Sequence, residues 1–151
     1  MRFLGNIIWH FPFFGFVSAF FTFLLGGLLV ITVIGAPIGL GLIQLSKFLL
    51  SPFSSSMIDN KELNAEPNKA WEAFGLIVRI LYFPFGLFLT VITLFQIVGL
   101  FVSIVGIPVA LVLAKSLGTY LNPVNKTCVS TSVAKELESR KAKAQVDAMV
   151  G

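Results

Sequence analysis

Charge is what this sequence lacks most. Only 12% of its 151 residues are Asp, Glu, Lys or Arg, whereas a soluble domain has about 25%. The stretches Phe3–Ser46 and Ile80–Ala114 contain no charged residue over 44 and 35 positions, and a helical membrane span needs only about 20 apolar residues. These absences exclude a soluble enzyme and a disordered chain. We expect an all-α integral membrane protein that crosses the bilayer several times.

The sequence also lacks the residues on which most site chemistry depends. Cys128 is the only cysteine and His10 the only histidine, so an internal disulfide and a histidine-based metal site are excluded. The uncharged stretches hold no base that would activate a serine or threonine. Phosphate-binding, dinucleotide-binding and zinc-binding motifs are missing, as is the basic stripe of a nucleic-acid-binding protein. We therefore expect no catalytic residue, no metal, no cofactor and no enzymatic activity.

The sequence repeats itself weakly at a separation of 71 residues. Between Phe11 and Phe53, ten of 43 positions are identical to the residue 71 positions later. The matches include Gly35-Ala36-Pro37 with Gly106-Ile107-Pro108, and Pro12 pairs with Pro84 at a separation of 72. Weak internal symmetry of this kind recurs in membrane transport folds. We predict two homologous membrane units.

The repeat divides the chain into four parts. They are a first membrane unit at 4–53, a hydrophilic linker at 54–73, a second membrane unit at 75–124 and a basic tail at 125–151. The linker has two lysines against four acidic residues and is expected to be a solvated loop. The tail is rich in Ala, Lys and Glu, and Glu136 and Arg140 have the spacing of a helical ion pair. It predicts a short cytoplasmic helix over 132–149.

Glycine and proline mark a break at the same place in both units. Pro37 and Pro108 each lack a backbone donor and disfavour helix in the preceding residue, and Gly35 and Gly106 stand two residues before them. Pro12 and Pro84 follow an aromatic residue near the start of a unit and are predicted to lie in the first turn of a helix, where proline is tolerated. A further set of small residues predicts close helix packing: Gly35, Gly39 and Gly41.

Two arrangements in the bilayer fit these units. Each unit has about 47 predominantly apolar residues, enough for two spans and a tight turn. The favoured arrangement has two helical hairpins and four membrane segments, with the amino terminus, linker and tail all cytoplasmic. In the alternative, one full helix per unit ends at Gly35 or Gly106, and the segments Pro37–Leu50 and Pro108–Leu121 lie along the membrane interface. That alternative makes the repeats inverted.

Aromatic and basic side chains near the ends of the units favour the hairpin arrangement. Such residues anchor a protein at the membrane interface, and lysine and arginine mark the cytoplasmic side. No Trp or Tyr lies between Phe11 and Glu66 or between Phe83 and Thr119. The predicted anchors are Trp9, Trp71, Tyr82, Tyr120, Lys47, Arg79 and Lys115.

Several short motifs lie at the ends and breaks of the two units. In the first unit they are Asn6-Ile7-Ile8-Trp9 and the run from Leu45-Ser46-Lys47 to Ser51-Pro52-Phe53. In the second they are Ser103–Val109 and Pro123-Val124, followed by Asn125-Lys126. With these motifs the sequence resembles the YccF family of small bacterial inner-membrane proteins, some members of which carry paired arginines in place of Asn125-Lys126. The resemblance covers residues 4–126. It implies an inner-membrane protein with paired domains, and it supplies no function and no catalytic residues.

Neutral polar groups remain as candidates for a site. The amide of Gln96 needs a partner in hydrocarbon, so it is expected to face another helix or water. Thr93 lies one turn away, and together with Gln44 and the breaks at Gly35-Pro37 and Gly106-Pro108 these residues are the candidate lining of a polar path.

Three functions fit this pattern. The first is a homo-oligomeric, channel-like or transport subunit for ions or small solutes, because four spans enclose a pore poorly on their own. The second is a non-catalytic accessory or scaffold subunit of another membrane complex, and the third is a lipid-binding membrane protein. The expected partners are membrane lipids, further copies of the chain and a possible membrane-protein partner.

Overall fold

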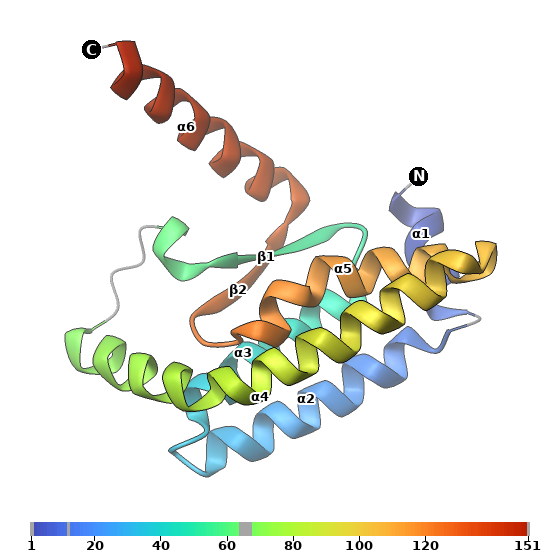
Figure 1. Cartoon of the computed structure of the whole chain (residues 1–151), viewed down its shortest axis with the longest axis horizontal. Helices are drawn as coiled ribbons and strands as arrows, with labels where there is room; N and C mark the ends of the chain where they lie inside the picture. The colour runs from blue at the N-terminus through green and yellow to red at the C-terminus, as the bar shows by residue number, and fades with distance from the viewer. Residues whose placement is uncertain (1, 12, 64–67, 151) are drawn as a thin grey trace.

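The computed structural model describes residues 2–11, 13–63 and 68–150, and it is mostly helical (Figure 1). Pro12 and residues 64–67 of the predicted linker lie outside the described residues. In chain order the elements are α1 (Arg2–His10), α2 (Gly15–Ile31), α3 (Ala36–Leu50), β1 (Ser55–Asp59), the 3-10 turn η1 (Asn60–Leu63), α4 (Lys69–Val102), the 3-10 turn η2 (Ile104–Gly106), α5 (Ile107–Leu121), β2 (Lys126–Ser130) and α6 (Thr131–Val150).

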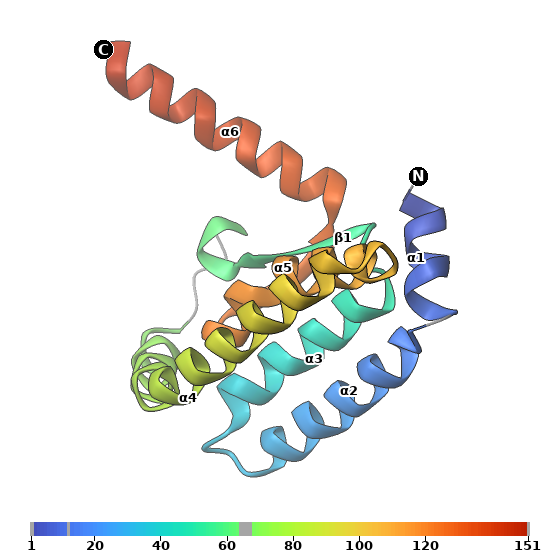
Figure 2. The same ribbon diagram turned by 45° about the vertical axis from the view of Figure 1, so that its right-hand side comes forward.

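Helices α2 and α3 form a first hairpin, in which the two backbones touch (Figure 2). A Cβ atom on Gly39 would lie 2.5 Å from the carbonyl oxygen of Gly26, and one on Gly26 would lie 2.8 Å from that of Gly39. Glycine therefore sits at both sides of the crossing, as small-residue packing in membranes requires. Near the open end of the hairpin, Phe16 of α2 and Leu50 of α3 line the same groove.

The later part of α4 and α5 form a second hairpin. The hydroxyl of Tyr82 donates to the carbonyl of Tyr120 at 3.1 Å, and a Cβ atom on Gly86 would lie 2.5 Å from the carbonyl oxygen of Leu121. The hairpin closes at η2, where the N–H of Gly106 donates to the carbonyl of Ser103 at 2.9 Å.

The predicted glycine–proline breaks are confirmed. Helix α3 begins directly after Gly35 and helix α5 directly after Gly106, with Pro37 and Pro108 in their first turns. A first-turn proline costs little, because its missing N–H would have no intrahelical partner.

The prediction for Pro84 is wrong, because this residue lies inside α4 and not in a first turn. Neighbouring groups in membrane helices can satisfy the backbone groups that a proline frees. At the corresponding place in the first half, α1 and α2 are separate helices bent by 77°. The two halves therefore differ most at their starts.

Two five-residue strands depart from the predicted all-α class. β1 and β2 pair antiparallel, with Asp59 opposite Lys126 and Ser55 opposite Ser130. β1 lies in the predicted linker, and β2 opens the predicted tail. Alternation over five residues is too short to separate a strand from a loop in the sequence, and the pairing partner is about 70 residues away along the chain.

Corresponding elements of the two halves lie 71 residues apart along the chain, which is the separation at which the sequence repeats. The bounds of α3 and α5 differ by 71 residues at both ends, and so do those of β1 and β2. Met57 lies opposite Cys128, which stands 71 positions after it, so the strand pairing is symmetric about this central pair.

The closed ends of the two hairpins point in opposite directions (Figures 1 and 2). Gly41 near the start of α3 contacts Pro123 after the end of α5, while Lys115 reaches the carbonyl of Pro52 beyond the end of α3. This arrangement differs from the favoured prediction, in which both closed ends share one side. The reason is that β1 follows α3, β2 follows α5, and antiparallel pairing brings these strands in from opposite ends.

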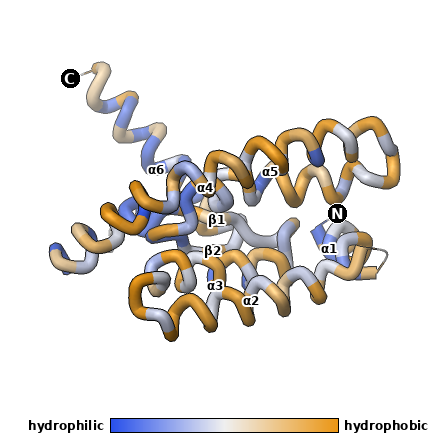
Figure 3. The backbone as a smooth tube through the Cα atoms, turned by 60° about the horizontal axis from the view of Figure 1, so that its bottom comes forward, coloured by the Kyte–Doolittle hydropathy of each residue, from blue (hydrophilic) through white to orange (hydrophobic). Residues whose placement is uncertain are grey.

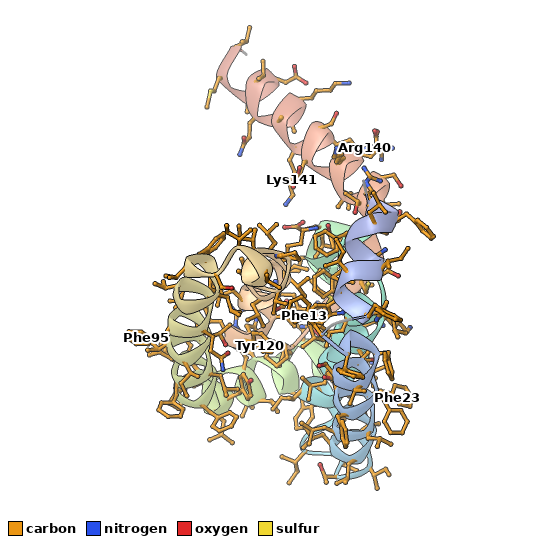
Figure 4. All side chains as sticks on the ribbon, turned by 90° about the vertical axis from the view of Figure 1, so that its right-hand side faces the viewer. Phe13, Phe23, Phe95, Tyr120, Arg140 and Lys141 are labelled. Carbon is orange, nitrogen blue, oxygen red and sulfur yellow. The ribbon has the colours of Figure 1, made fainter. Side chains whose placement is uncertain are left out.

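Among the described residues, two helical segments are long and apolar enough to cross a membrane, Lys69–Val102 and Ile104–Leu121. Helices α1 and α2 make a third if they are taken as one bent span. Helix α3 is apolar but shorter. Four membrane segments and the predicted unit boundaries therefore stay predictions. Large apolar side chains cover the outside of the helices, and Figure 4 shows Phe23 and Phe95 pointing away from the body.

The polar elements gather on one face. The ribbon of β1 and β2 lies over the hairpins, and both α1 and α6 project on its side (Figures 1 and 4). In Figure 3 the hydrophobic colour dominates both hairpins, whereas α6 has long hydrophilic stretches. The predicted tail helix is confirmed as α6, and the guanidinium of Arg140 pairs with Glu136 at 3.2 Å.

The contact between Gly26 and Gly39 leads to a prediction about stability. Gly39→Ala forces a Cβ into the backbone of α2 and should destabilise the protein by about 1–3 kcal/mol, the usual cost of overpacking. Gly27→Ala is the matched control, because a Cβ there meets nothing within 4 Å and alanine favours helix by about 0.5–1 kcal/mol. Thermal unfolding in detergent should show a lower Tm for Gly39→Ala alone, and equal Tm values would contradict the close crossing.

Candidate functional site

The structure does not bring the predicted polar path together. Thr93 is 7% exposed and its hydroxyl donates to the carbonyl of Leu89 at 2.8 Å. Gln96, one turn later, is exposed on the outer side of α4. The two side chains therefore face different surroundings, and a path inside one chain does not include both.

The two helix breaks have their backbone groups bonded locally. At the first, the Thr32 hydroxyl donates to the carbonyl of Leu29 at 2.7 Å and accepts from the N–H of Gly35 at 3.2 Å. The carbonyl of Gly35 accepts from the N–H of Gly39 at 2.8 Å. The first break reverses the direction of the chain. The carbonyls of Leu29 and Gly35 already accept hydrogen bonds from groups of the protein.

Gln44 belongs to a polar cluster beneath the ribbon. Its side-chain oxygen accepts from the N–H of Cys128 at 3.3 Å, which ties α3 to β2. A small cavity of about 160 Å³ lies beside it. The polar side chains that line this cavity are Gln44, Asn60, Trp71, Asn125, Lys126 and Thr127.

Sequence reasoning missed most of this cluster. The hydroxyl of Thr127 donates to the side-chain oxygen of Asn60, and Asn125 has a φ of 59°, a left-handed conformation that Asn tolerates well. Asn125 follows Pro123-Val124, and this turn signal is the one feature that marks the site in the sequence.

Three of the predicted aromatic anchors make contacts inside the protein. Trp9 is 5% exposed, and its indole N–H donates to the carbonyl of Leu49 at 2.8 Å. Tyr82 and Tyr120 are joined by the hydrogen bond described above, and Figure 4 shows Tyr120 near Phe13 in the middle of the body. These side chains join helices within the chain, and their role as membrane-interface anchors stays a prediction.

The three predicted basic anchors have different surroundings. The ammonium of Lys115 donates to the carbonyl of Pro52 at 3.0 Å and lies 5.6 Å from the centre of the Phe53 ring, so it connects the two halves. Arg79 lines an open cavity of about 600 Å³ below the ribbon. Lys47 lines an apolar groove between α2 and α3.

Ion pairs join the linker to the tail and to α4. Lys126 pairs with Asp59 at 3.1 Å across the ribbon, and Lys141 of α6 pairs with Glu62 at 2.6 Å. Lys61 pairs with Glu72 at 3.0 Å. Such exposed pairs contribute little each, but together they orient the polar face. In the described part of the chain no three His, Cys, Asp or Glu side chains gather to hold a metal ion.

Cys128 is the only thiol, and it lies half-buried in the ribbon. Burial raises the pKa of its thiol, while a hydrogen bond with Ser55 and the charge of Lys47 offset part of the rise. A raised pKa lowers the thiolate fraction near neutral pH, and the thiolate is the reactive form. The arrangement favours an unreactive thiol.

This pKa shift predicts slow alkylation. Near pH 8, Cys128 should react with a maleimide more slowly than an exposed cysteine, and its rate should keep rising to higher pH because its pKa is raised. The control is Ser130→Cys in a Cys128→Ser background, since Ser130 is exposed at the end of β2. The burial of the thiol would be contradicted if the alkylation rate of Cys128 rose over the same pH range as that of the control, or over a lower one.

Comparison with known proteins connects this structure to one family. Residues 4–55, about a third of the chain, match the family model described as the YccF inner membrane component domain. No curated protein and no solved structure matches the chain. The matched residues span α1, α2, α3 and the first residue of β1, which confirms the predicted family resemblance for the first half. The chain therefore carries a YccF inner membrane component domain at residues 4–55 and is an inner-membrane protein with several candidate membrane spans.

Proposed function

We propose that this protein is a homo-oligomeric, channel-like membrane subunit whose polar path lies between copies. The observation that carries the proposal is the position of Gln96, which is exposed on the outer face of α4 between large apolar neighbours. Phe95 is 75% exposed and Val98 65% exposed on either side of it. In a single chain, the most polar side chain of the second uncharged stretch therefore points toward lipid.

An amide in hydrocarbon is costly unless it has a hydrogen-bonding partner. Gln96 has both donors and an acceptor, so the same side chain of a second copy complements it. Gly99 lies on the same helical face three residues later and is exposed, and Ser103, which directly follows the end of α4, is exposed as well. A Cβ atom on Gly99 would meet nothing within 4 Å. Association through this face would give Gln96 a partner and line the interface with polar and small groups.

The symmetry of the halves supports paired units within each subunit. The shared 71-residue separation of α3 and α5, and of β1 and β2, supports a second YccF-like unit at 75–124. The polar ribbon and α6, with basic residues in excess in the tail, support a cytoplasmic position for this face and for both termini.

One observation favours the accessory-subunit alternative. Helix α6 is 20 residues long, and Ala134 is the one buried residue among those that the structure describes there. It projects from the ribbon as a largely solvated helix (Figure 1). A projecting helix offers a surface to another protein, and purification in mild detergent separates the two functions. A partner that co-purifies in fixed ratio favours the accessory role, and a homo-oligomer alone favours the channel-like role.

The proposal predicts a specific effect of Gln96→Leu. The change removes the interfacial amide, so it should weaken association by about tenfold, in line with the ~1–2 kcal/mol of an interhelical hydrogen bond in model membrane peptides. Any ion flux in liposomes should change with it. Val98→Leu is the control, because Val98 is exposed on the same helix but is already apolar.

Two outcomes would contradict the proposal. One is a reconstituted oligomer that passes no ions over a range of salts and voltages. The other is a Gln96→Leu variant with unchanged association and flux.

A further inference from the structure

An apolar groove between α2 and α3 has features of a lipid site. Its volume is about 540 Å³, within the range of about 300–1,000 Å³ that small-molecule sites occupy. Phe16, Phe20 and Phe23 of α2 form one wall, and Ala19 lies 2% exposed at the base. The hydroxyl of Ser46 also lines the groove, but it is bonded to the carbonyl of Ile43 at 2.7 Å. The walls are therefore effectively apolar.

Lys47 is the one charged residue among those that line this groove. It lies in the last turn of α3, one turn after Gln44, which accepts a hydrogen bond from Cys128 of the ribbon, so it is close to the polar face. Within the described residues it takes part in no ion pair. Lysine at such a place extends its ammonium to the headgroup level while its stem stays in hydrocarbon.

We infer that this groove holds an acyl chain of one anionic phospholipid, with the phosphate beside Lys47. The groove runs along two turns of α2, from Phe16 to Phe23, which is about 10 Å at 1.5 Å per residue. The acyl chain fills the apolar groove, and the phosphate is the negatively charged partner of the Lys47 ammonium. This inference rests on the membrane location alone and does not depend on a channel-like role.

A second copy of the chain fits the groove less well. All seven acidic residues lie in the linker or the tail, and none lies in 1–58 or 73–135. In the candidate membrane helices of another copy the one carboxylate among the described residues is that of Glu72 in the first turn of α4, and it already pairs with Lys61. Covering an unpaired ammonium with apolar side chains is costly. A phospholipid supplies both the apolar chain and the anion.

The second half of the chain offers an internal control. The residue 71 positions after Lys47 is Gly118, and the residue 71 positions after Phe20 is Val91. Val91 is 43% exposed on α4, and Phe20 is 58% exposed on α2. The corresponding surface of the second hairpin thus has a similar exposure and lacks the cation.

Photocrosslinking in nanodiscs tests the inference. The full chain carries a benzophenone amino acid at one position, Phe20→benzoylphenylalanine or Val91→benzoylphenylalanine, in equimolar phosphatidylglycerol and phosphatidylcholine. Mass spectrometry then gives the headgroup of each lipid adduct. At position 20 the anionic lipid should be enriched about fivefold, the size expected for one lysine near an anionic lipid surface. At position 91 the adducts should follow the bulk ratio.

Lys47→Gln completes the experiment, because it removes the charge at an exposed position and leaves the groove in place. Lipid adducts at position 20 should persist, and their composition should return to the bulk ratio. The inference is overturned if position 20 shows no enrichment, if its enrichment survives Lys47→Gln, or if it crosslinks to a second protein chain instead of lipid.

Discussion

The structure depends on one constraint, which is that backbone polar groups in hydrocarbon must find partners within the protein. Long apolar helices satisfy this requirement, but each half of the chain must also reverse direction. At the first reversal the Thr32 hydroxyl both donates to the carbonyl of Leu29 and accepts from the N–H of Gly35. Pro37 then lies in the first turn of α3, where the backbone needs no N–H donor. At the second reversal the N–H of Gly106 donates to the backbone carbonyl of Ser103, and Pro108 again lies in the first turn of the helix that follows.

A second constraint sets how the halves meet. The charged linker and tail cannot enter the bilayer, so they form the ribbon over the hairpins, fastened by Asp59 with Lys126. Because β1 and β2 pair antiparallel about Met57 and Cys128, the helices before them run in opposite directions. Lys115 on Pro52 and Gln44 on Cys128 then link each half to the other. The polar face therefore joins the two halves of the chain. The outer faces of α2 and α4 remain accessible to lipid or to another copy.

The sequence predicts those features that depend on local physics. The uncharged stretches predict membrane helices, Pro37 and Pro108 mark where α3 and α5 begin, and Glu136 with Arg140 predicts α6.

Features that depend on pairing between distant parts of the chain cannot be predicted in this way. The ribbon needs two weak five-residue strands about 70 residues apart, and the interior positions of Trp9 and Thr93 depend on which helix face is covered. Pro84 was misplaced because helix α4 continues through it, whereas the first half has two separate helices, α1 and α2, bent by 77°. Likewise, the cluster of Asn60, Asn125 and Thr127 exists only once the ribbon has formed.

The opposed direction of the two hairpins is the central claim, and paramagnetic relaxation by a nitroxide at either closed end tests it most directly. Both labels are placed in a Cys128→Ser background, at Val33 or at Ile104, which are 70% and 84% exposed. Trp71 shares a cavity with Pro37 and Leu40 at the start of α3, while Trp9 packs in the cluster that Val109 of α5 contacts. The label at Ile104 should therefore broaden the indole N–H signal of Trp9 and spare that of Trp71, and the label at Val33 should do the reverse. If both labels broaden the same indole, or neither, the hairpins are not arranged in this way.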